Sequence, residues 1–423
     1  MSTTSLPSYI PPTFGRSPSY TAEPQAHEQR LALNGVRQRP SGDFIKYSRS
    51  GGFSLRLIEQ PGGVILPVYG CGEAVEGTVE LVKPESVASV EVKIEGTLRL
   101  KEIAEGGTTT RNLCVSSASW TKDTFEGSFP PSVPFSLTLP ATFSDGRDEY
   151  PLPPTHEAHL SGVPGFRAAI DYMVSVTVQK DKSLLRLGNS TISTPFVYYP
   201  RSRPAVPLPT MFVMRQNPGD TSLVQVTEWQ CYESVLTSKT QGGKDITAKL
   251  YVPALRVYCM AQSIPFHLIF ASSAFSLAAF LPLGPTTALP ADKQPTRIQI
   301  LRQTTVDVRN TTVLGTKTDI WRVQAIGEGI FRHAGDGPNW IAYNGDIGLS
   351  PEVKIGGFKA GGFSIKDFLV LGVTPPDPSK APFGELRQVV PIRLTTDPWD
   401  VSTGYPEPII LPEEACPEFQ FPG

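Results

Sequence analysis

Apolar and polar residues alternate with a period of two through much of the chain between residues 51 and 399. Over residues 90–100 the even positions hold Val, Val, Ile, Gly, Leu and Leu, and the odd positions are polar or charged. Residues 170–178 also carry apolar side chains at every even position. A helix would bring Val90 and Lys93 onto one face, so both segments are predicted to be strands with one buried face.

Shorter segments of the same kind are bounded by clusters of Gly, Pro, Asn and Asp, which are turn formers. The predicted short strands cover residues 53–58, 75–82, 249–253, 263–271, 297–301, 304–308, 320–325, 363–373 and 389–395. No long amphipathic helix is predicted. Many short strands separated by turns indicate an all-β protein, with two Ig-like antiparallel β-sandwiches in tandem.

A proline-rich connector divides this pattern. Residues 200–209 contain four Pro, which disfavour sheet pairing and stiffen the backbone toward polyproline II. The connector (201–209) therefore separates a first sandwich, 51–200, from a second, 210–399. The ends differ in composition: the first 26 residues hold five Pro, five Ser and four Thr, and 400–423 has five acidic residues and no Lys or Arg. The head, 1–50, and the tail, 400–423, are predicted to be disordered.

Composition narrows the class of protein. The chain has 42 Pro and 37 Gly, which suits a turn-rich β-protein, and 38 Lys+Arg against 40 Asp+Glu give a net charge of −2. This balance argues against nucleic acid as a partner. The five Cys form no C-x-x-C pair, which predicts reduced thiols in the cytosol without a disulfide framework or zinc site. The first 30 residues contain no apolar run of the secretory type.

One apolar segment, residues 264–283, is as long as a membrane span, but it contains His267, Pro265 and Pro282. It is predicted to be a buried strand followed by a packed loop rather than a span.

The sequence contains no convincing catalytic motif. The His156-Glu157-Ala158-His159 segment follows several prolines and is predicted to be a surface loop. No G-x-S-x-G elbow, P-loop or dinucleotide fingerprint is complete. The sequence favours a protein that is not an enzyme and has no cofactor or metal.

Two short motifs in the head carry recognisable binding chemistry. Leu6, Pro7, Ser8 and Tyr9 form the first, and Ser17, Pro18, Ser19 and Tyr20 form the second. WW domains bind such P-x-Y segments because proline pre-forms a polyproline II turn that docks between aromatic side chains. Leu6 keeps an apolar contact at the first position and Ser17 does not. The alternatives are a solvated tail with incidental tyrosines and, at Ser17-Pro18, a proline-directed phosphorylation site.

The order of several motifs resembles the arrestin family, in particular the fungal α-arrestins (arrestin-related trafficking adaptors). In the first sandwich the motifs are 72–81 with 89–100, and 135–140 with 152–155 and 172–178. The connector residues 199–204 resemble the family's Pro/Arg hinge. In the second sandwich, Leu-Tyr-Val-Pro (250–253) and Ile-Pro-Phe-His-Leu (264–268) resemble two motifs of the family, and Val-Pro-Ile-Arg-Leu (390–394) resembles its closing strand. The resemblance covers roughly residues 51–399.

The resemblance implies a function as well as a fold. Members of this family act as adaptors: one surface docks on the tails of membrane transporters or receptors, and PY motifs recruit a HECT-type ubiquitin ligase through its WW domains. The cargo is then ubiquitinated and internalised, and the adaptor itself can carry ubiquitin. The implied location is the cytoplasm, with peripheral recruitment to the plasma membrane or endosomes.

The sequence departs from the family pattern in one respect. Family PY motifs often follow the second sandwich, whereas residues 400–423 contain none and the candidates here lie in the head. Two alternatives therefore stay open. One is an arrestin-fold scaffold or sorting-coat subunit without ligase recruitment. The other is a carbohydrate-active or lectin-like double sandwich, which a secretory signal and paired Cys would have favoured.

Overall fold

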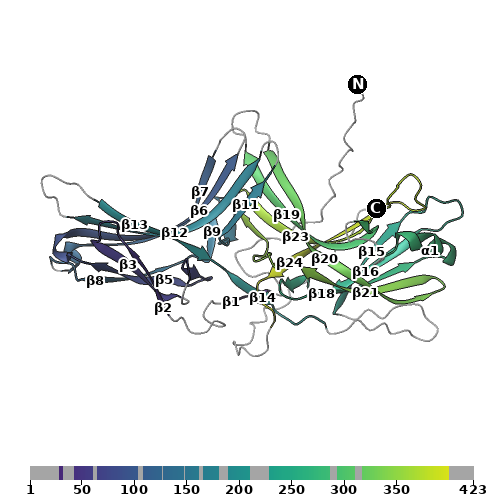
Figure 1. Cartoon of the computed structure of the whole chain (residues 1–423), viewed down its shortest axis with the longest axis horizontal. Helices are drawn as coiled ribbons and strands as arrows, with labels where there is room; N and C mark the ends of the chain where they lie inside the picture. The colour runs from purple at the N-terminus through teal and green to yellow at the C-terminus, as the bar shows by residue number, and fades with distance from the viewer. Residues whose placement is uncertain are drawn as a thin grey trace, which may run out of the picture.

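The computed structural model describes residues 28–31, 42–60, 64–102, 108–125, 127–146, 148–161, 165–180, 189–209, 228–285, 293–309 and 317–399. Within these residues the regular structure is almost entirely strand. Among the described residues the only α-helix is α1 (Ala274–Phe280), and short 3-10 turns occur at Pro84–Ser86, Lys122–Phe125 and Leu281–Leu283. The all-β fold class predicted from the period-two pattern is confirmed. Two bodies of stacked sheet lie side by side along the long axis of the molecule (Figure 1).

The first half of the chain supplies the strands of the first sandwich and the hinge. They are β1 (Glu28–Leu31), β2 (Gly42–Tyr47), β3 (Phe53–Gln60), β4 (Val68–Tyr69), β5 (Ala74–Leu81), β6 (Val87–Glu102), β7 (Thr108–Thr121), β8 (Ser132–Thr138), β9 (Thr142–Ser144), β10 (Glu149–Pro151), β11 (His156–Leu160), β12 (Phe166–Lys180), β13 (Asn189–Tyr198) and β14 (Arg201–Pro204).

The second half supplies the second sandwich. Its strands are β15 (Trp229–Leu236), β16 (Ile246–Pro253), β17 (Val257–Cys259), β18 (Ile264–Ala271), β19 (Thr296–Arg309), β20 (Lys317–Gly337), β21 (Trp340–Leu349), β22 (Phe358–Ala360), β23 (Phe363–Val373) and β24 (Leu386–Thr395).

In the first sandwich a sheet of order β4-β13-β12-β6-β7, with β11 added to β12, faces a four-stranded sheet of order β2-β3-β5-β8. The alternation in the sequence decides which side chains meet between them. Val92 and Ile94 of β6 point into the core from one sheet, and Leu55 and Val79 point into it from the other; all four are almost completely buried. From Ser89 to Arg99 the odd positions of β6 stay on the outer, polar face.

The second sandwich is a single ten-stranded sheet of order β15-β16-β18-β21-β20-β19-β23-β24-β17, with β22 added to β23. The sheet curls so that its two sides enclose one core, which contains Leu250, Phe270 and Leu371. The two ends of this sheet lie close together. The Ser234 hydroxyl on the edge strand β15 donates a 3.2 Å hydrogen bond to the Gln388 side chain on β24, near the opposite edge.

The two sandwiches share buried surface as well as a connector. Phe358 and Phe363, which flank the β22–β23 turn of the second half, belong to the hydrophobic core of the first. Ile355 and Ile365 join the same cluster. Burying each large side chain contributes on the order of 1.5–3 kcal/mol. The loop around β22 therefore fastens the second sandwich to the first.

Several local predictions are corrected. The head predicted to be disordered over 1–50 contains β1 and β2, and β2 is the edge strand beside β3. The connector was predicted to avoid sheet pairing, yet β14 pairs with β1. Pro204 is tolerated because it is the last residue of a two-stranded sheet, where few backbone donors are required.

Three other segments also differ from prediction. Residues 156–159, predicted to be a surface loop, belong to strand β11 (His156–Leu160); the prolines precede the strand. Residues 297–301 and 304–308 form one strand, β19, because the polar residues Arg302 and Gln303 that separated the two predictions continue the same pairing with β23. After strand β18, the packed loop predicted up to residue 283 contains the short helix α1. Among the described helices, none is long and apolar enough to cross a bilayer.

Gly96 is required for packing inside the first sandwich. A Cβ at this position would lie 2.6 Å from the Tyr172 ring and 2.8 Å from Cys114 Sγ. We expect Gly96→Ala to destabilise the protein by about 1–3 kcal/mol, because overpacking forces neighbours off their rotamers. The matched control is Gly348→Ala, since a Cβ there meets nothing within 4 Å. Urea unfolding midpoints check this prediction, and equal midpoints for the two variants would contradict it.

Candidate functional site at the junction of the sandwiches

The hinge strand β14 lies between the two sandwiches and carries the chain from one to the other. It pairs antiparallel with β1, so that Arg30 faces Ser202 and Gln29 faces Arg203. The two-stranded sheet lies at the base of the junction in Figure 1. A segment from the beginning of the chain is thereby fixed to the connector between the sandwiches.

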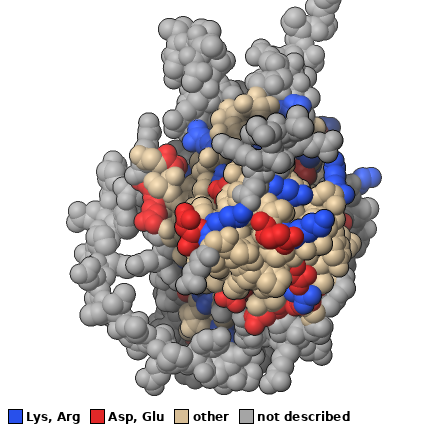
Figure 2. Space-filling view, turned by 90° about the vertical axis from the view of Figure 1, so that its left-hand side faces the viewer, with Lys and Arg blue, Asp and Glu red and all other residues tan. Residues whose placement is uncertain are grey.

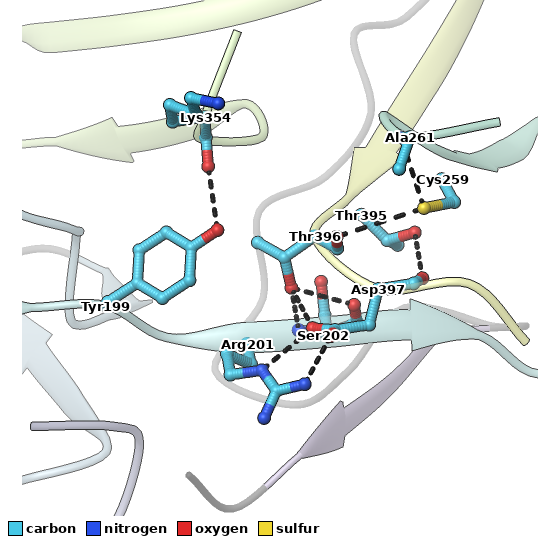
Figure 3. Close-up of polar contacts among 9 residues, drawn as sticks. All are labelled: Tyr199, Arg201, Ser202, Cys259, Ala261, Lys354, Thr395, Thr396 and Asp397. Atoms are coloured by element: carbon cyan, nitrogen blue, oxygen red, sulfur yellow. Dashed lines mark hydrogen bonds and ion pairs between the residues drawn. The ribbon is translucent and has the colours of Figure 1, made fainter. Parts of the chain in front are cut away.

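The strongest polar contact of the hinge is a two-pronged ion pair between Arg201 and Asp397 (Figure 3). Arg201 Nε donates to Asp397 Oδ2 at 2.9 Å, and its Nη2 donates to Oδ1. The Arg201 side chain is only 7% exposed and that of Asp397 21%. The hydrogen bonds to Asp397 raise the pKa of Arg201, so the guanidinium is fixed in its charged form. Planar two-point pairing of this kind is both strong and directional.

Thr396 extends the same contact along the backbone. Ser202 N donates to the Thr396 hydroxyl oxygen at 2.9 Å, and Asp397 N donates to Ser202 O at 3.0 Å. The Thr396 hydroxyl group lies 3.0 Å from Ser202 O and 2.6 Å from Asp397 Oδ2, either of which accepts its proton. The residues that follow β24 are therefore bonded to the hinge through main chain and side chains together (Figure 3).

The β1 strand is tied to the second sandwich by a further ion pair. Arg393 Nη2, on β24, donates to Glu28 Oε1 at 3.0 Å, and Arg393 Nε lies 2.5 Å from Glu28 Oε2. Arg203 Nε donates to Gln29 Oε1 at 2.8 Å. Glu28, Arg201 and Arg203 are all buried. We name this set of contacts between β1, β14 and the end of β24 the hinge clasp.

The loop that carries β22 makes the polar contacts on the other side of the junction. Lys359 Nζ donates to the Tyr150 hydroxyl at 2.6 Å and lies 4.5 Å from the centre of the Tyr150 ring. Tyr199 OH donates to Lys354 O at 3.1 Å (Figure 3). Both bonds connect the first sandwich, or the residue just after its last strand, to the segment that leads into β23. They therefore add polar contacts to the apolar packing of Phe358 and Phe363.

His156 lies within the shared apolar contact. Its ring stacks on Phe363 with centroids 6.1 Å apart and meets Phe358 edge-on at 6.0 Å. Burial and the nearby positive charge of Arg302 together lower the pKa of His156 to about 4. Arg302 is itself held by Asp367, with Nε donating to Oδ1 at 2.7 Å. His156 is therefore a neutral aromatic spacer at neutral pH.

The junction is built for holding segments in place. Its functional groups are guanidinium, carboxylate and hydroxyl groups already bonded to one another. No group of three or more His, Cys, Asp or Glu side chains suited to a metal ion occurs among the described residues. At the outer end of the first sandwich, basic and acidic side chains are interspersed on the described surface without an extended area of either sign (Figure 2).

The residues predicted to bind WW domains, namely Leu6, Pro7, Ser8, Tyr9, Ser17, Pro18, Ser19 and Tyr20, lie outside the described residues. That prediction is untested. The hinge clasp was not predicted, because no partners could be assigned to the hinge arginines from the sequence. Arg201 and Asp397 are 196 positions apart, and only the fold brings them together. The sequence did contain one signal for these contacts, namely two arginines in a proline-rich connector. A connector that is only solvated does not require arginines, so their presence indicates polar partners elsewhere in the fold.

A scan against protein-family models found no match to this chain. A search of curated proteins found no significant match either.

Removing one partner of the buried Arg201–Asp397 pair is expected to destabilise the protein strongly. Asp397→Asn leaves the buried Arg201 guanidinium without its counter-charge, which costs about 3 kcal/mol. The matched control is Asp171→Asn, because the Arg99–Asp171 pair has exposed side chains (56% and 46%) and its loss is worth about 1 kcal/mol or less. Urea unfolding at pH 7 measures both. Similar losses for the two variants would contradict a special role for the hinge pair.

His156 predicts a pH dependence of stability. Its folded pKa, about 4, lies below the ordinary 6.5, so the unfolded chain binds the proton more readily. The contribution of His156 to the free energy of unfolding is fully present above pH 6.5 and is lost as the pH drops toward 4. The total loss is roughly 3 kcal/mol at 1.36 kcal/mol per pKa unit.

We expect His156→Phe to remove this part of the acid sensitivity while keeping the ring contacts. Unfolding free energies measured between pH 7 and pH 4 test it. An equal drop in the variant and the native protein would assign the sensitivity to other groups.

Proposed function

We propose that this protein is a non-catalytic, arrestin-like adaptor that links membrane cargo proteins to a WW-domain ubiquitin ligase of the HECT type. Its activity is to bring partners together rather than to transform a substrate. The ordered motifs of the sequence that resemble arrestin-related trafficking adaptors support the proposal. The pair of antiparallel sandwiches joined by a short hinge is consistent with them.

The observation that carries the proposal is the attachment of β1 to the hinge clasp. Glu28 and Gln29 are bonded to Arg393 and Arg203, so the chain that follows the WW-binding motifs starts from a fixed point between the sandwiches. Tyr20 precedes Glu28 by eight residues. Even a fully extended chain of eight residues spans at most about 29 Å. A ligase held at the second motif is thereby kept near the junction.

A fixed distance matters for an adaptor of this kind. A ligase tethered close to a rigid two-sandwich body has a high effective concentration near any cargo tail bound on the same body. Lysines of the cargo, and those of the adaptor itself, then become the acceptors of ubiquitin. In this proposal the protein acts in the cytoplasm and is recruited peripherally to the plasma membrane or endosomes by its cargo.

The test is binding of the full chain to tandem WW domains of a HECT-type ligase. We expect Tyr9→Ala to weaken binding about tenfold, equivalent to 1.4 kcal/mol, because Leu6 and Tyr9 form the motif with an apolar first contact. Tyr20→Ala is expected to weaken it by about threefold, since the second motif adds avidity rather than a strong site. The control is Tyr47→Ala, a tyrosine of β2 that is 72% exposed, and it should leave binding unchanged.

Isothermal titration calorimetry gives the affinities. If the Tyr9→Ala/Tyr20→Ala double variant binds WW domains as well as the native chain, the ligase-adaptor proposal fails. An arrestin-fold scaffold or sorting-coat subunit without ligase recruitment is then the better account.

A further inference from the structure

Strand β7 lies at the free edge of the larger sheet of the first sandwich. The sheet runs β4-β13-β12-β6-β7, and among the described strands β7 pairs only with β6. With 14 residues, β7 is the longest strand at the edge of any described sheet. An edge strand presents unpaired N–H and C=O groups to any extended segment that approaches it. The outer edge of β7 is therefore a template for one more strand.

One hydrogen bond shows which backbone groups of β7 point outward. Thr121 N donates at 3.2 Å to the hydroxyl oxygen of Thr124, a side chain outside the β6 ladder. The pairing of β6 with β7 is regular from residue 114 to residue 121. Alternate residues of a strand direct their N–H and C=O groups to the same edge, so those of Ser119, Ser117 and Val115 also point away from β6. The described turn and loop hydrogen bonds satisfy none of these groups.

This edge carries little of the protection that edge strands usually have. Natural edges are blocked by Lys, Pro, bulges or inward-pointing charges. Residues 112–121 contain no charged residue and no proline, and the bulge at Leu113 lies before the regular stretch. Val115 is 53% exposed, and Ala118 and Trp120 are only partly buried against the core. A further strand beside β7 would cover this apolar surface.

Charges at the two ends of the stretch make it complementary to a second copy of itself. Arg111 precedes it and Asp123 follows it, and neither side chain takes part in an ion pair with a described residue. In an antiparallel pair of two β7 strands centred on Ser117, Val115 faces Ser119 of the other copy. The same register brings Arg111 opposite Asp123 at both ends. The bulge displaces Arg111 by one position, which its long side chain can span.

We propose that β7 is a self-association surface, on which two copies of the chain pair their β7 strands antiparallel about a two-fold axis at Ser117. A two-fold interface uses the same patch on both subunits, so each favourable contact occurs twice. The pairing joins the two larger sheets into one and removes both free edges. Because the contact is a single strand pair with few large apolar side chains, the dimer belongs to the weak, transient class of interfaces. In dilute solution the chain is then mainly monomeric. The inference does not rest on the proposed adaptor function.

Sedimentation velocity of the full chain tests the proposal in a concentration series up to about 100 μM, which detects dissociation constants in the micromolar range. We expect the average mass to rise with concentration from that of the monomer toward twice that value. A chain that stays monomeric through the series would overturn the proposal. A mass that rises beyond the dimer would reveal a head-to-tail contact and contradict it as well.

Position 117 allows a charge-exchange experiment, because it faces itself across the two-fold axis. Ser117→Lys brings two ammonium groups together, and like charges directly opposite on paired strands are destabilising. We expect it to weaken self-association at least about tenfold, and Ser117→Glu to do the same. An equimolar mixture of the two variants should associate again, since each pair then combines opposite charges. Association in the mixture also shows that both variants are folded.

Thr191→Lys is the matched control. Thr191 is exposed on β13 of the same sheet, and β12 and β6 separate that strand from the β7 edge. The control should associate as the native chain does. If Ser117→Lys also associates as the native chain does, the contact lies on another surface and the proposal is overturned. Failure of the Lys and Glu variants to associate with each other would exclude Ser117 as the self-facing position and would overturn it too.

Discussion

The buried ion pair between Arg201 and Asp397 is the contact on which the arrangement of the two sandwiches depends. It joins the connector to the chain that follows the last strand, across 196 positions of sequence. Two parallel bonds fix the direction of β14 as well as its position. Once β14 is placed, β1 can pair with it, and Glu28 reaches Arg393. The entry of the chain, its hinge and its final strand are thereby held in one small region.

The charged clasp and the apolar contact around Phe358 and Phe363 have different parts in this junction. Burial of the aromatic rings supplies attraction that is largely indifferent to direction. The ion pairs add little net free energy over apolar groups of similar size, but they make a misplaced hinge costly because buried charges would lose their partners. Together they specify one relation between the sandwiches, and the proposed adaptor function would require such a fixed relation.

Features that depend on neighbouring residues could be predicted from the sequence, whereas contacts between residues far apart in the chain could not. The buried faces of β6 and β12 follow from period-two alternation, because a strand imposes it locally. The polar residues Arg302 and Gln303 within β19 and the prolines before β11 interrupted that signal without interrupting the strands. The hinge clasp was beyond prediction from one sequence, since nothing local pairs Arg201 with a carboxylate near the other end. The predicted WW-binding motifs are the reverse case: they are local in sequence, and the prediction rests on the residue pattern alone.

The most direct test of the junction is the distribution of distances between the sandwiches. Spin labels introduced as genetically encoded amino acids at Ser119 on β7 and at Lys380, both exposed, report it by pulsed electron resonance. A rigid clasp gives one narrow distance in the native chain and a broader one in Asp397→Asn, with Asp171→Asn unchanged. A broad distribution in the native chain, indifferent to Asp397→Asn, would contradict the account.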